Sequence, residues 1–299
     1  MTRTFSVLGD SISTFEGITP DGWRVFYEAE RREATGVLNA EDTWWSHVIN
    51  HFGGTLHANA AWSGCVVEGE LFPAGASKER IEALEKGGTA PSDVLVYIGI
   101  NDYGWGSAEA QVVAGKPSAP AELVAACTHV GDVAGMAPEN AIDGFAESYA
   151  RMLRRIKERY PHATVWCATL APGRVSGNRV STSPRNFRGI CIDRYNDAIA
   201  SAANSTGCRL VDLAALGFDY DAVDGTHPSA KGMKQLAAMF IRGMRAADPS
   251  TTNEPFEGEA LLTEDMRTTD FCAKPCVGCE FARSTGNDWF HVCEKQIGK

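Results

Sequence analysis

The chain has 299 residues, of which 28 are Lys or Arg and 38 are Asp or Glu, so its formal net charge is −10. This length predicts one large domain with a small appendage, or two modest domains, and the 44% of hydrophobic residues is ordinary for a globular protein. The acidic balance excludes a broad phosphate-binding surface, which depends on clustered Lys and Arg, so we expect no nucleic acid partner.

Short β-branched runs alternate with longer segments of helical period, a pattern typical of a parallel sheet with crossover helices. The longest helical segment, from Asp143 to Tyr160, places apolar residues at spacings of three and four and is followed by Pro161. We predict five strands, at residues 5–8, 55–59, 94–98, 164–168 and 209–211, and further helices at residues 43–52, 78–85, 195–203 and 229–246. The predicted fold is a three-layer α/β/α sandwich around a five-stranded parallel sheet.

Two regions interrupt this alternation. Residues 103–140 are rich in Ala, Gly and Val and follow the end of a predicted strand, where long connections are often lids or binding loops. We expect either a lid insertion or a surface insertion without function there. Residues 248–270 are polar and acidic and contain two prolines, which predicts a linker. The predicted division is a domain at residues 1–247, this linker, and a small Cys-rich C-terminal tail at residues 271–299.

Candidate catalytic residues follow three of the predicted strands, at the edge where open α/β sheets place their sites. Ser11 comes after the first strand, Gly64 after the second and Asn101 after the third. A serine at such a place is, by itself, more often a helix cap or a turn residue. Asp224 and His227 lie three residues apart on a glycine-containing turn, which lets a carboxylate orient one imidazole nitrogen while the other faces a substrate. Together these residues predict a hydrolytic site.

Ester hydrolysis also needs hydrogen-bond donors aimed at the oxygen that becomes negative in the transition state. The Asn101 carboxamide is one candidate, and the Gly64 amide is another because the absent side chain lets a ligand oxygen approach. Trp62 and Trp105 flank these donors and can serve as a platform for an acyl group or sugar, or as simple wall packing. The sequence leaves two alternative nucleophiles and two alternative acids open: Ser13, Ser63, Asp219 and Asp221.

These motifs resemble, in the same order, the four blocks of the SGNH, or GDSL-type, hydrolase superfamily. They are Gly9-Asp10-Ser11, Gly64, Gly99-Ile100-Asn101-Asp102 and Asp224-Gly225-Thr226-His227-Pro228, and the resemblance covers about residues 5–246. It implies a flavodoxin-like fold in which Ser11 is the nucleophile, His227 the base and Asp224 its orienting partner. It also implies an oxyanion hole formed by the amides of Ser11 and Gly64 and by the Asn101 side chain.

The resemblance implies a serine esterase that cleaves acyl esters through an acyl-enzyme and needs no cofactor for catalysis. We expect a small-molecule acyl ester as its partner, favouring short-chain or acetyl esters of carbohydrates or small metabolites. A lysophospholipase or thioesterase activity stays open. The alternative from another class is a non-catalytic, metal-ribbon interaction protein on a hydrolase scaffold.

The tail contains Cys272, Cys276, Cys279 and Cys293, whose spacing can bring four sulfur ligands to one structural zinc ion. His291 can replace one of them, and disulfides, free thiols or an iron–sulfur cluster are alternatives. The other five cysteines are scattered, as buried thiols in a reducing compartment usually are. Because no apolar run is long enough for a signal segment or a membrane span, we expect a cytoplasmic protein.

Overall fold

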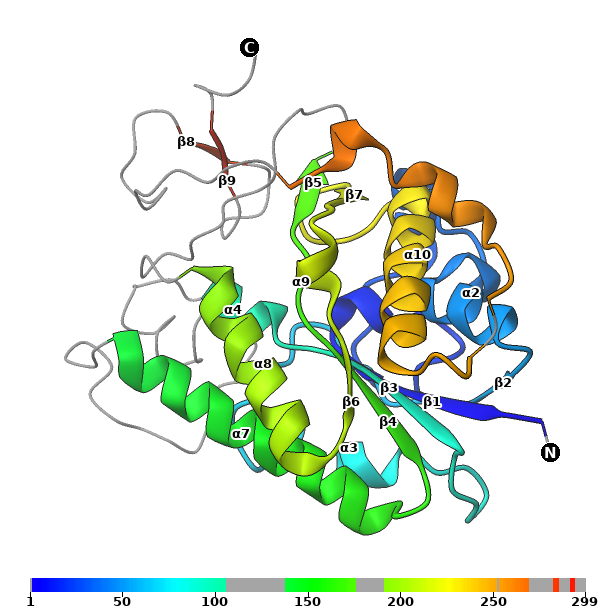
Figure 1. Ribbon diagram of the computed structural model, residues 1–299, viewed down its shortest axis with the longest axis vertical. Helices are drawn as coiled ribbons and strands as arrows, with labels where there is room; N and C mark the ends of the chain where they lie inside the picture. Colours follow the sequence, from blue (N-terminus) through cyan, green and yellow to red (C-terminus); the bar gives the residue numbers. More distant parts are fainter. Residues whose placement is uncertain are drawn as a thin grey trace.

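The computed structural model describes residues 2–105, 138–175, 191–251, 253–268, 282–284 and 291–293. The side chains of residues 104–105, 138–141, 282–284 and 291–293 lie outside the description. One parallel sheet runs through the molecule in the order β2-β1-β3-β4-β6 (Figure 1). Its strands are β1 (Thr4–Gly9), β2 (Thr55–Asn59), β3 (Asp93–Tyr97), β4 (Thr164–Ala168) and β6 (Arg209–Val211). The predicted five-stranded parallel sheet is confirmed, and each strand begins and ends within one residue of its predicted bounds.

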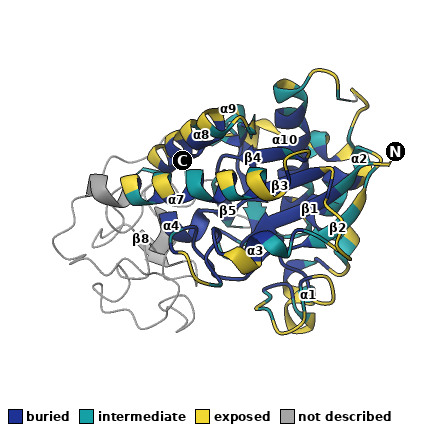
Figure 2. Cartoon of the chain, turned by 90° about the horizontal axis from the view of Figure 1, so that it is seen from below, coloured by how far each residue is buried: buried dark blue, intermediate teal, exposed yellow. Residues whose placement is uncertain are grey.

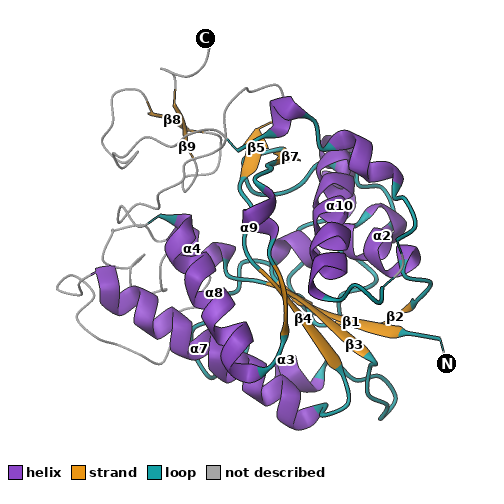
Figure 3. Ribbon diagram, viewed as in Figure 1, coloured by secondary structure: helices purple, strands orange, loops and turns teal. Residues whose placement is uncertain are grey.

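Helices cover both faces of this sheet, so the molecule has three layers (Figure 3). On one face, α2 (Trp44–His51) packs against α10 (Ala230–Ala247). The other face carries α3 (Lys78–Glu82), α7 (Pro138–Arg159) and α8 (Ile192–Thr206), with α7 and α8 in extensive contact. The predicted α/β/α sandwich is therefore confirmed. Among the described residues, none of the helices combines the length and the apolar character that crossing a bilayer requires.

The burial of each element follows its sequence pattern. Every residue of β3 is buried, as a central strand covered on both faces requires, and its Val94-Leu95-Val96 run supplies the apolar side chains. In α7, Phe145, Tyr149, Met152 and Ile156 recur at helical spacing and are fully buried. Figure 2 shows the result: a dark-blue sheet beneath helices such as α7, whose outward face is exposed.

Several short elements were not predicted, because runs of three to seven residues carry little periodic signal. The helices are α1 (Ala29–Thr35), α4 (Ile100–Trp105) and α9 (Leu213–Leu216), and the 3-10 turns are η1 (Ser11–Ser13), η2 (Ala40–Asp42), η4 (Glu257–Leu261) and η5 (Glu264–Met266). β5 (Gly173–Val175) pairs in parallel with β7 (Tyr220–Ala222), and β8 (Ala282–Ser284) pairs with β9 (His291–Cys293) antiparallel. β7 leads directly into the turn that carries Asp224 and His227.

Residues 253–268, inside the segment predicted as a linker, pack on the sandwich. Leu262 and Met266 are buried, and the Gln235 side chain of α10 donates a hydrogen bond to the Leu261 carbonyl at 2.9 Å. The boundary predicted at residue 271 stays a prediction, because residues 269–281 lie outside the description. The lid predicted at residues 103–140 also stays a prediction, because residues 106–137 lie outside the described residues.

Candidate active site

The strand order creates a crevice at the carboxyl edge of the sheet. β1 lies between β2 and β3, so the chain winds to opposite sides of β1 and the loops after β1 and β3 diverge to opposite faces. Ser11 lies two residues after the end of β1, and Asn101 lies in the first turn of α4, which begins shortly after β3. Gly64 lies in the loop after β2. The three predicted strand-end residues therefore meet where open α/β sheets bind ligands.

The turn after β1 fixes the position of Ser11. The Asp10 side chain accepts a hydrogen bond from the Ile12 amide at 3.1 Å and so caps η1, which begins at Ser11. Gly9 cannot carry a side chain here, because an added Cβ would lie 2.3 Å from Ser13 Oγ and 3.1 Å from the Tyr97 carbonyl oxygen. The Gly-Asp-Ser sequence is thus what this tight strand-to-turn transition needs.

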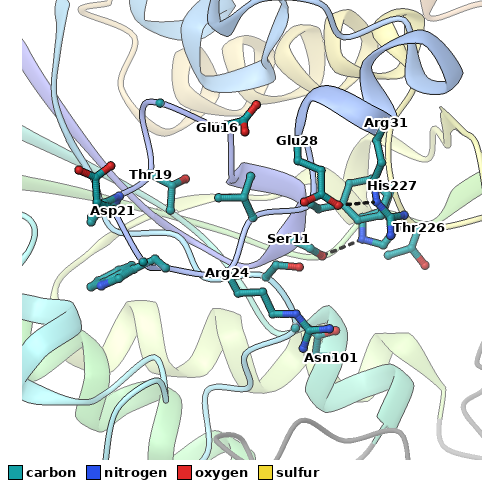
Figure 4. A pocket seen from close by; sticks show the side chains of 18 of the residues that line it. Ser11, Glu16, Thr19, Asp21, Arg24, Glu28, Arg31, Asn101, Thr226 and His227 are labelled. Carbon is teal, nitrogen blue, oxygen red and sulfur yellow. Dashed lines mark hydrogen bonds and ion pairs between the residues drawn. The ribbon is translucent and has the colours of Figure 1, made fainter.

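The structure brings Ser11, His227 and Asp224 into one hydrogen-bonded chain, and Figure 4 shows its contact between Ser11 and His227. His227 Nε2 lies 2.8 Å from Ser11 Oγ, and His227 Nδ1 lies 2.7 Å from Asp224 Oδ2. The other carboxylate oxygen of Asp224 accepts from the backbone amides of Thr226, at 3.0 Å, and of His227, at 2.8 Å. Asp224 therefore shapes the turn with one oxygen and orients the imidazole with the other.

The charge of Asp224 sets the roles of the two imidazole nitrogens. Burial acts to raise the pKa of Asp224, but the hydrogen bond and charge of His227 and the two backbone amides outweigh it, so the pKa is lowered below its ordinary value. An ionised carboxylate accepts a hydrogen bond from Nδ1–H and so keeps the proton on Nδ1, which leaves Nε2 free to accept the Ser11 hydroxyl proton. This is the tautomer that a general base requires.

Asn101 and Gly64 line the same cavity as Ser11 and His227, a space of about 620 Å³. The Asn101 Nδ2 donates one hydrogen to the Cys65 carbonyl at 2.8 Å, which fixes the carboxamide and leaves its second hydrogen for a ligand. Gly64 has a φ of 85°, a left-handed conformation that favours glycine. The buried carboxylate of Asp102 accepts from the amides of Val67 and Glu68 and so braces this loop.

A buried arginine holds the ends of β1 and β2 together behind these residues. Arg80 has no exposed surface, and its guanidinium donates to the carbonyls of Gly9 at 2.6 Å, Ala60 at 2.7 Å and Pro73 at 2.8 Å. Because Gly9 precedes Asp10-Ser11 and Ala60 precedes the Gly64 loop, this one side chain fixes their relative position. Nothing in the sequence pattern around Arg80 indicated this role.

The contacts of the alternative nucleophiles and acids argue against a catalytic role for them. Ser13 is fully buried, and its hydroxyl oxygen accepts from Trp44 Nε1 at 3.2 Å. Asp219 is buried in an ion pair with Arg174 at 3.0 Å, and Asp221 accepts from the Ser229 hydroxyl. Ser63 does line the cavity, but His227 Nε2 meets the Ser11 hydroxyl. The geometry therefore favours Ser11 and Asp224 over the alternatives.

One wall of the cavity comes from residues 14–31, here called the wall segment, which carries no motif that would have marked it in the sequence. Its charged and aromatic residues at the cavity are Glu16, Asp21, Trp23, Arg24, Phe26, Glu28 and Arg31. The predicted platform Trp62 does not line the cavity; it packs against Phe72 and Trp23, with ring centroids 4.7 and 5.7 Å apart. The side chain of Trp105 lies outside the description.

The buried Asp10 predicts a pH-dependent stability. Burial raises the pKa of this carboxyl from 3.8 to about 7, against the opposing effects of the Ile12 amide and the Arg80 charge. Its folded-state pKa lies above its unfolded value, so the stability that it contributes is complete below pH 4 and is lost as the pH rises through 7. Relative to Asp10→Asn, wild type should lose about 3 kcal/mol of unfolding free energy between pH 5 and pH 8, because the loss is about 1.4 kcal/mol per pH unit up to about pH 7 and levels off above it. Urea titrations of both proteins at the two pH values measure this difference, and parallel pH profiles would contradict it.

The predicted zinc site stays a prediction. Cys272, Cys276 and Cys279 lie outside the described residues, and for Cys293, in β9, the backbone alone is described. Within the described residues, no group of three or more His, Cys, Asp or Glu side chains is arranged to hold a metal ion.

A hydroxyl, an imidazole and a carboxylate linked in this way beside a cavity with amide donors define the site of a serine hydrolase. Residues 7–235 match the family described as GDSL-like lipase/acylhydrolase. The chain belongs to this family of esterases, which confirms the resemblance inferred from the four motifs. Comparison with curated proteins gives no significant match.

Two solved structures illustrate the likeness of fold. A structure described as a GDSL-like lipase from Bacteroides ovatus is 23% identical, with a TM-score of 0.53, and the match covers 82% of this chain and 99% of that one. A second, from Bacteroides uniformis and similarly described, is 21% identical, with a TM-score of 0.52, and the match covers 83% and 96%. At these identities the comparison supports the fold alone.

Proposed function

We propose that this protein hydrolyses acyl esters with Ser11 as nucleophile, His227 as general base and Asp224 as the residue that orients His227. The observation that carries the proposal is the hydrogen-bonded chain from Ser11 Oγ through the imidazole to Asp224, with steps of 2.8 and 2.7 Å, at the edge of a 620 Å³ cavity. Residues so arranged divide hydrolysis into formation and hydrolysis of an acyl-enzyme.

In the first half of the reaction, Ser11 Oγ forms a bond to the ester carbonyl carbon and its proton passes to His227 Nε2. The carbonyl oxygen becomes negative and accepts hydrogen bonds from the Asn101 side chain and the amides of Gly64 and Ser11. The intermediate then expels the alcohol, which takes the proton from His227. In the second half, a water oxygen bonds to the acyl carbon and a water proton passes to His227 Nε2. The bond from the acyl carbon to Ser11 Oγ then breaks, Ser11 takes the proton from His227, and the carboxylic acid is released.

The favoured substrates are short-chain or acetyl esters of carbohydrates or small metabolites. The lining includes five charged residues. Among the described residues, Val25 and Ile100 are the only Val, Leu, Ile or Met side chains that it contains. Arg24 extends along the cavity toward Asn101, so a polar group beside the reacting ester would meet a cation (Figure 4). Such walls suit a hydroxyl-rich alcohol better than a long acyl chain, which needs apolar surface.

A substrate panel tests this proposal. It consists of sugar acetates, p-nitrophenyl esters of increasing acyl length and acyl-thioesters, compared by kcat/KM. We expect the acetates to be cleaved most efficiently, with a steady decline as the acyl chain grows. Highest efficiency on long-chain esters or on thioesters would instead favour a lysophospholipase or thioesterase activity.

Asn101→Ala should lower kcat about 10²- to 10³-fold, because one donor to the oxyanion is worth roughly 2.7–4 kcal/mol in the transition state. KM should change little, since the ground-state carbonyl oxygen carries much less charge. Steady-state kinetics on p-nitrophenyl acetate measure both constants. The variant also loses the hydrogen bond to the Cys65 carbonyl, so its thermal unfolding midpoint is measured alongside. An effect confined to KM would argue against the oxyanion role.

A further inference from the structure

The imidazole of His227 lies flat on the phenyl ring of Phe26. The two ring centroids are 3.5 Å apart and the ring planes differ by 5°. Phe26 is 8% exposed and belongs to the wall segment, between η1 and α1. Hydrogen bonds of an imidazole lie in its plane, so those to Ser11 and Asp224 fix two edges of the ring while Phe26 covers one face.

The opposite face of Phe26 is also covered. The Arg31 guanidinium carbon lies 4.5 Å from the centroid of the phenyl ring, and because the imidazole occupies one face, Arg31 must lie over the other. Glu28 holds the guanidinium through Nε at 3.3 Å. The phenyl ring is thus covered on one face by the imidazole and on the other by a cation, and only part of its edge borders the cavity.

The backbone around Phe26 is tied to both sides of the site. Its amide donates to Thr14 Oγ1 at 2.9 Å, and the Thr14 hydroxyl donates to the Ser11 carbonyl at 2.9 Å. The neighbouring Tyr27 hydroxyl donates to the carbonyl of Pro228 at 2.9 Å. Phe26 is therefore held in a fixed relation to the turn that carries Ser11 and to the turn that carries His227.

This contact matters most after Ser11 has been acylated. In free enzyme, hydrogen bonds at both ring nitrogens hold the imidazole in its plane. In the acyl-enzyme, Ser11 Oγ is bonded to the acyl carbon and has no proton to donate, so Asp224 alone holds one edge of the ring. Stacking on the flat Phe26 ring resists tilting of the imidazole out of its own plane but allows small shifts of the imidazole within that plane.

We propose that Phe26 is a positioning residue that holds the plane of the His227 imidazole during hydrolysis of the acyl-enzyme. This inference rests on the function proposed above. In that step, the water oxygen bonds to the acyl carbon and its proton passes to His227 Nε2. The bond from the acyl carbon to Ser11 Oγ then breaks, and the proton returns to Ser11. Acylation depends less on Phe26, because Ser11 itself still holds the ring.

Phe26→Leu tests the proposal by keeping apolar volume while removing the flat face. Stopped-flow hydrolysis of p-nitrophenyl acetate separates acylation, seen in the burst of nitrophenol, from deacylation, seen in the steady state. We expect deacylation to slow about ten- to a hundred-fold, the effect of a small misplacement of a reacting group, and acylation to slow by much less. Consequently kcat and KM should fall together while kcat/KM stays close to wild type. Phe26→Tyr, which restores a flat ring, should recover most of the lost rate.

Phe15→Leu is the matched control. Phe15 lies in the same wall segment, is 4% exposed and has Arg32 over its ring at 5.2 Å, but it is not among the described residues that line the cavity. It should lower the thermal unfolding midpoint about as much as Phe26→Leu and leave both rates unchanged. Phe26→Met fills the same site without a flat ring and gives the same test if the leucine variant does not fold.

Three results would overturn the proposal: equal slowing of acylation and deacylation, rates like those of Phe15→Leu, or no recovery with tyrosine. Absence of any burst or turnover in wild type is a different outcome. It would refute the proposed esterase function itself, together with the inference that rests on it.

Discussion

Ser11→Ala is expected to lower kcat for ester hydrolysis by on the order of 10⁵-fold, because it removes the atom that attacks the carbonyl carbon. The residual rate would come from the oxyanion donors and from binding alone. KM for a small ester should stay within a few-fold of wild type, since the change removes one hydroxyl from a side chain that is 4% exposed. Steady-state kinetics on p-nitrophenyl acetate measure both constants.

Ser13→Ala supplies the comparison that makes this result specific. Ser13 lies in the same turn, η1, but its hydroxyl oxygen is engaged by Trp44 and has no exposed surface. Below its unfolding temperature, this variant should keep most of the wild-type activity. Loss of activity in Ser13→Ala together with retention in Ser11→Ala would show that the nucleophile was assigned to the wrong serine.

Asp224→Asn should lower kcat by about 10⁴-fold, the loss seen when a triad carboxylate becomes a carboxamide and the imidazole adopts the wrong tautomer. The asparagine oxygen can still accept from the amides of Thr226 and His227, so the turn should keep its shape. The lost function is the anionic acceptor for Nδ1–H. The kcat of the variant and its circular dichroism spectrum together distinguish loss of chemistry from loss of fold.

Asp221→Asn is the control for the carboxylate, since Asp221 is three residues away and accepts from the Ser229 hydroxyl. Its activity should stay within a few-fold of wild type. The pH dependence adds a second check: because the pKa of Asp224 is lowered, protonation of this carboxylate should not limit activity until the pH falls below the ordinary carboxyl range. A comparable loss in Asp221→Asn would contradict the assignment of Asp224.

The elements and residues that the sequence could predict are those with local signals. The Val94-Leu95-Val96 run predicts a strand buried on both faces, and the strand-end positions of Ser11 and Asn101 follow from it and from its neighbour β1. The Asp224 and His227 pair is recognisable because both residues lie on one short turn. Their meeting with Ser11 is a consequence of the parallel sheet, which brings distant strand ends to one edge.

The parts that could not be predicted depend on contacts between distant segments. Phe26 and Arg31 lie in a mixture of charged and aromatic residues that carries no periodic signal, and their relation to His227 exists only in the folded protein. Arg80 is similar: a charged residue in a short helix predicts an exposed side chain, yet three backbone carbonyls hold it in the interior. β5 and β7, at three residues each, are too short to recognise.

The most direct test is covalent labelling of folded wild-type protein with a fluorophosphonate, with the adduct located by peptide mass spectrometry. We expect one adduct per chain, on Ser11, with no adduct in Ser11→Ala and much slower labelling in Asp224→Asn. An unlabelled wild type, or an adduct that persists after Ser11 is replaced, would contradict this expectation.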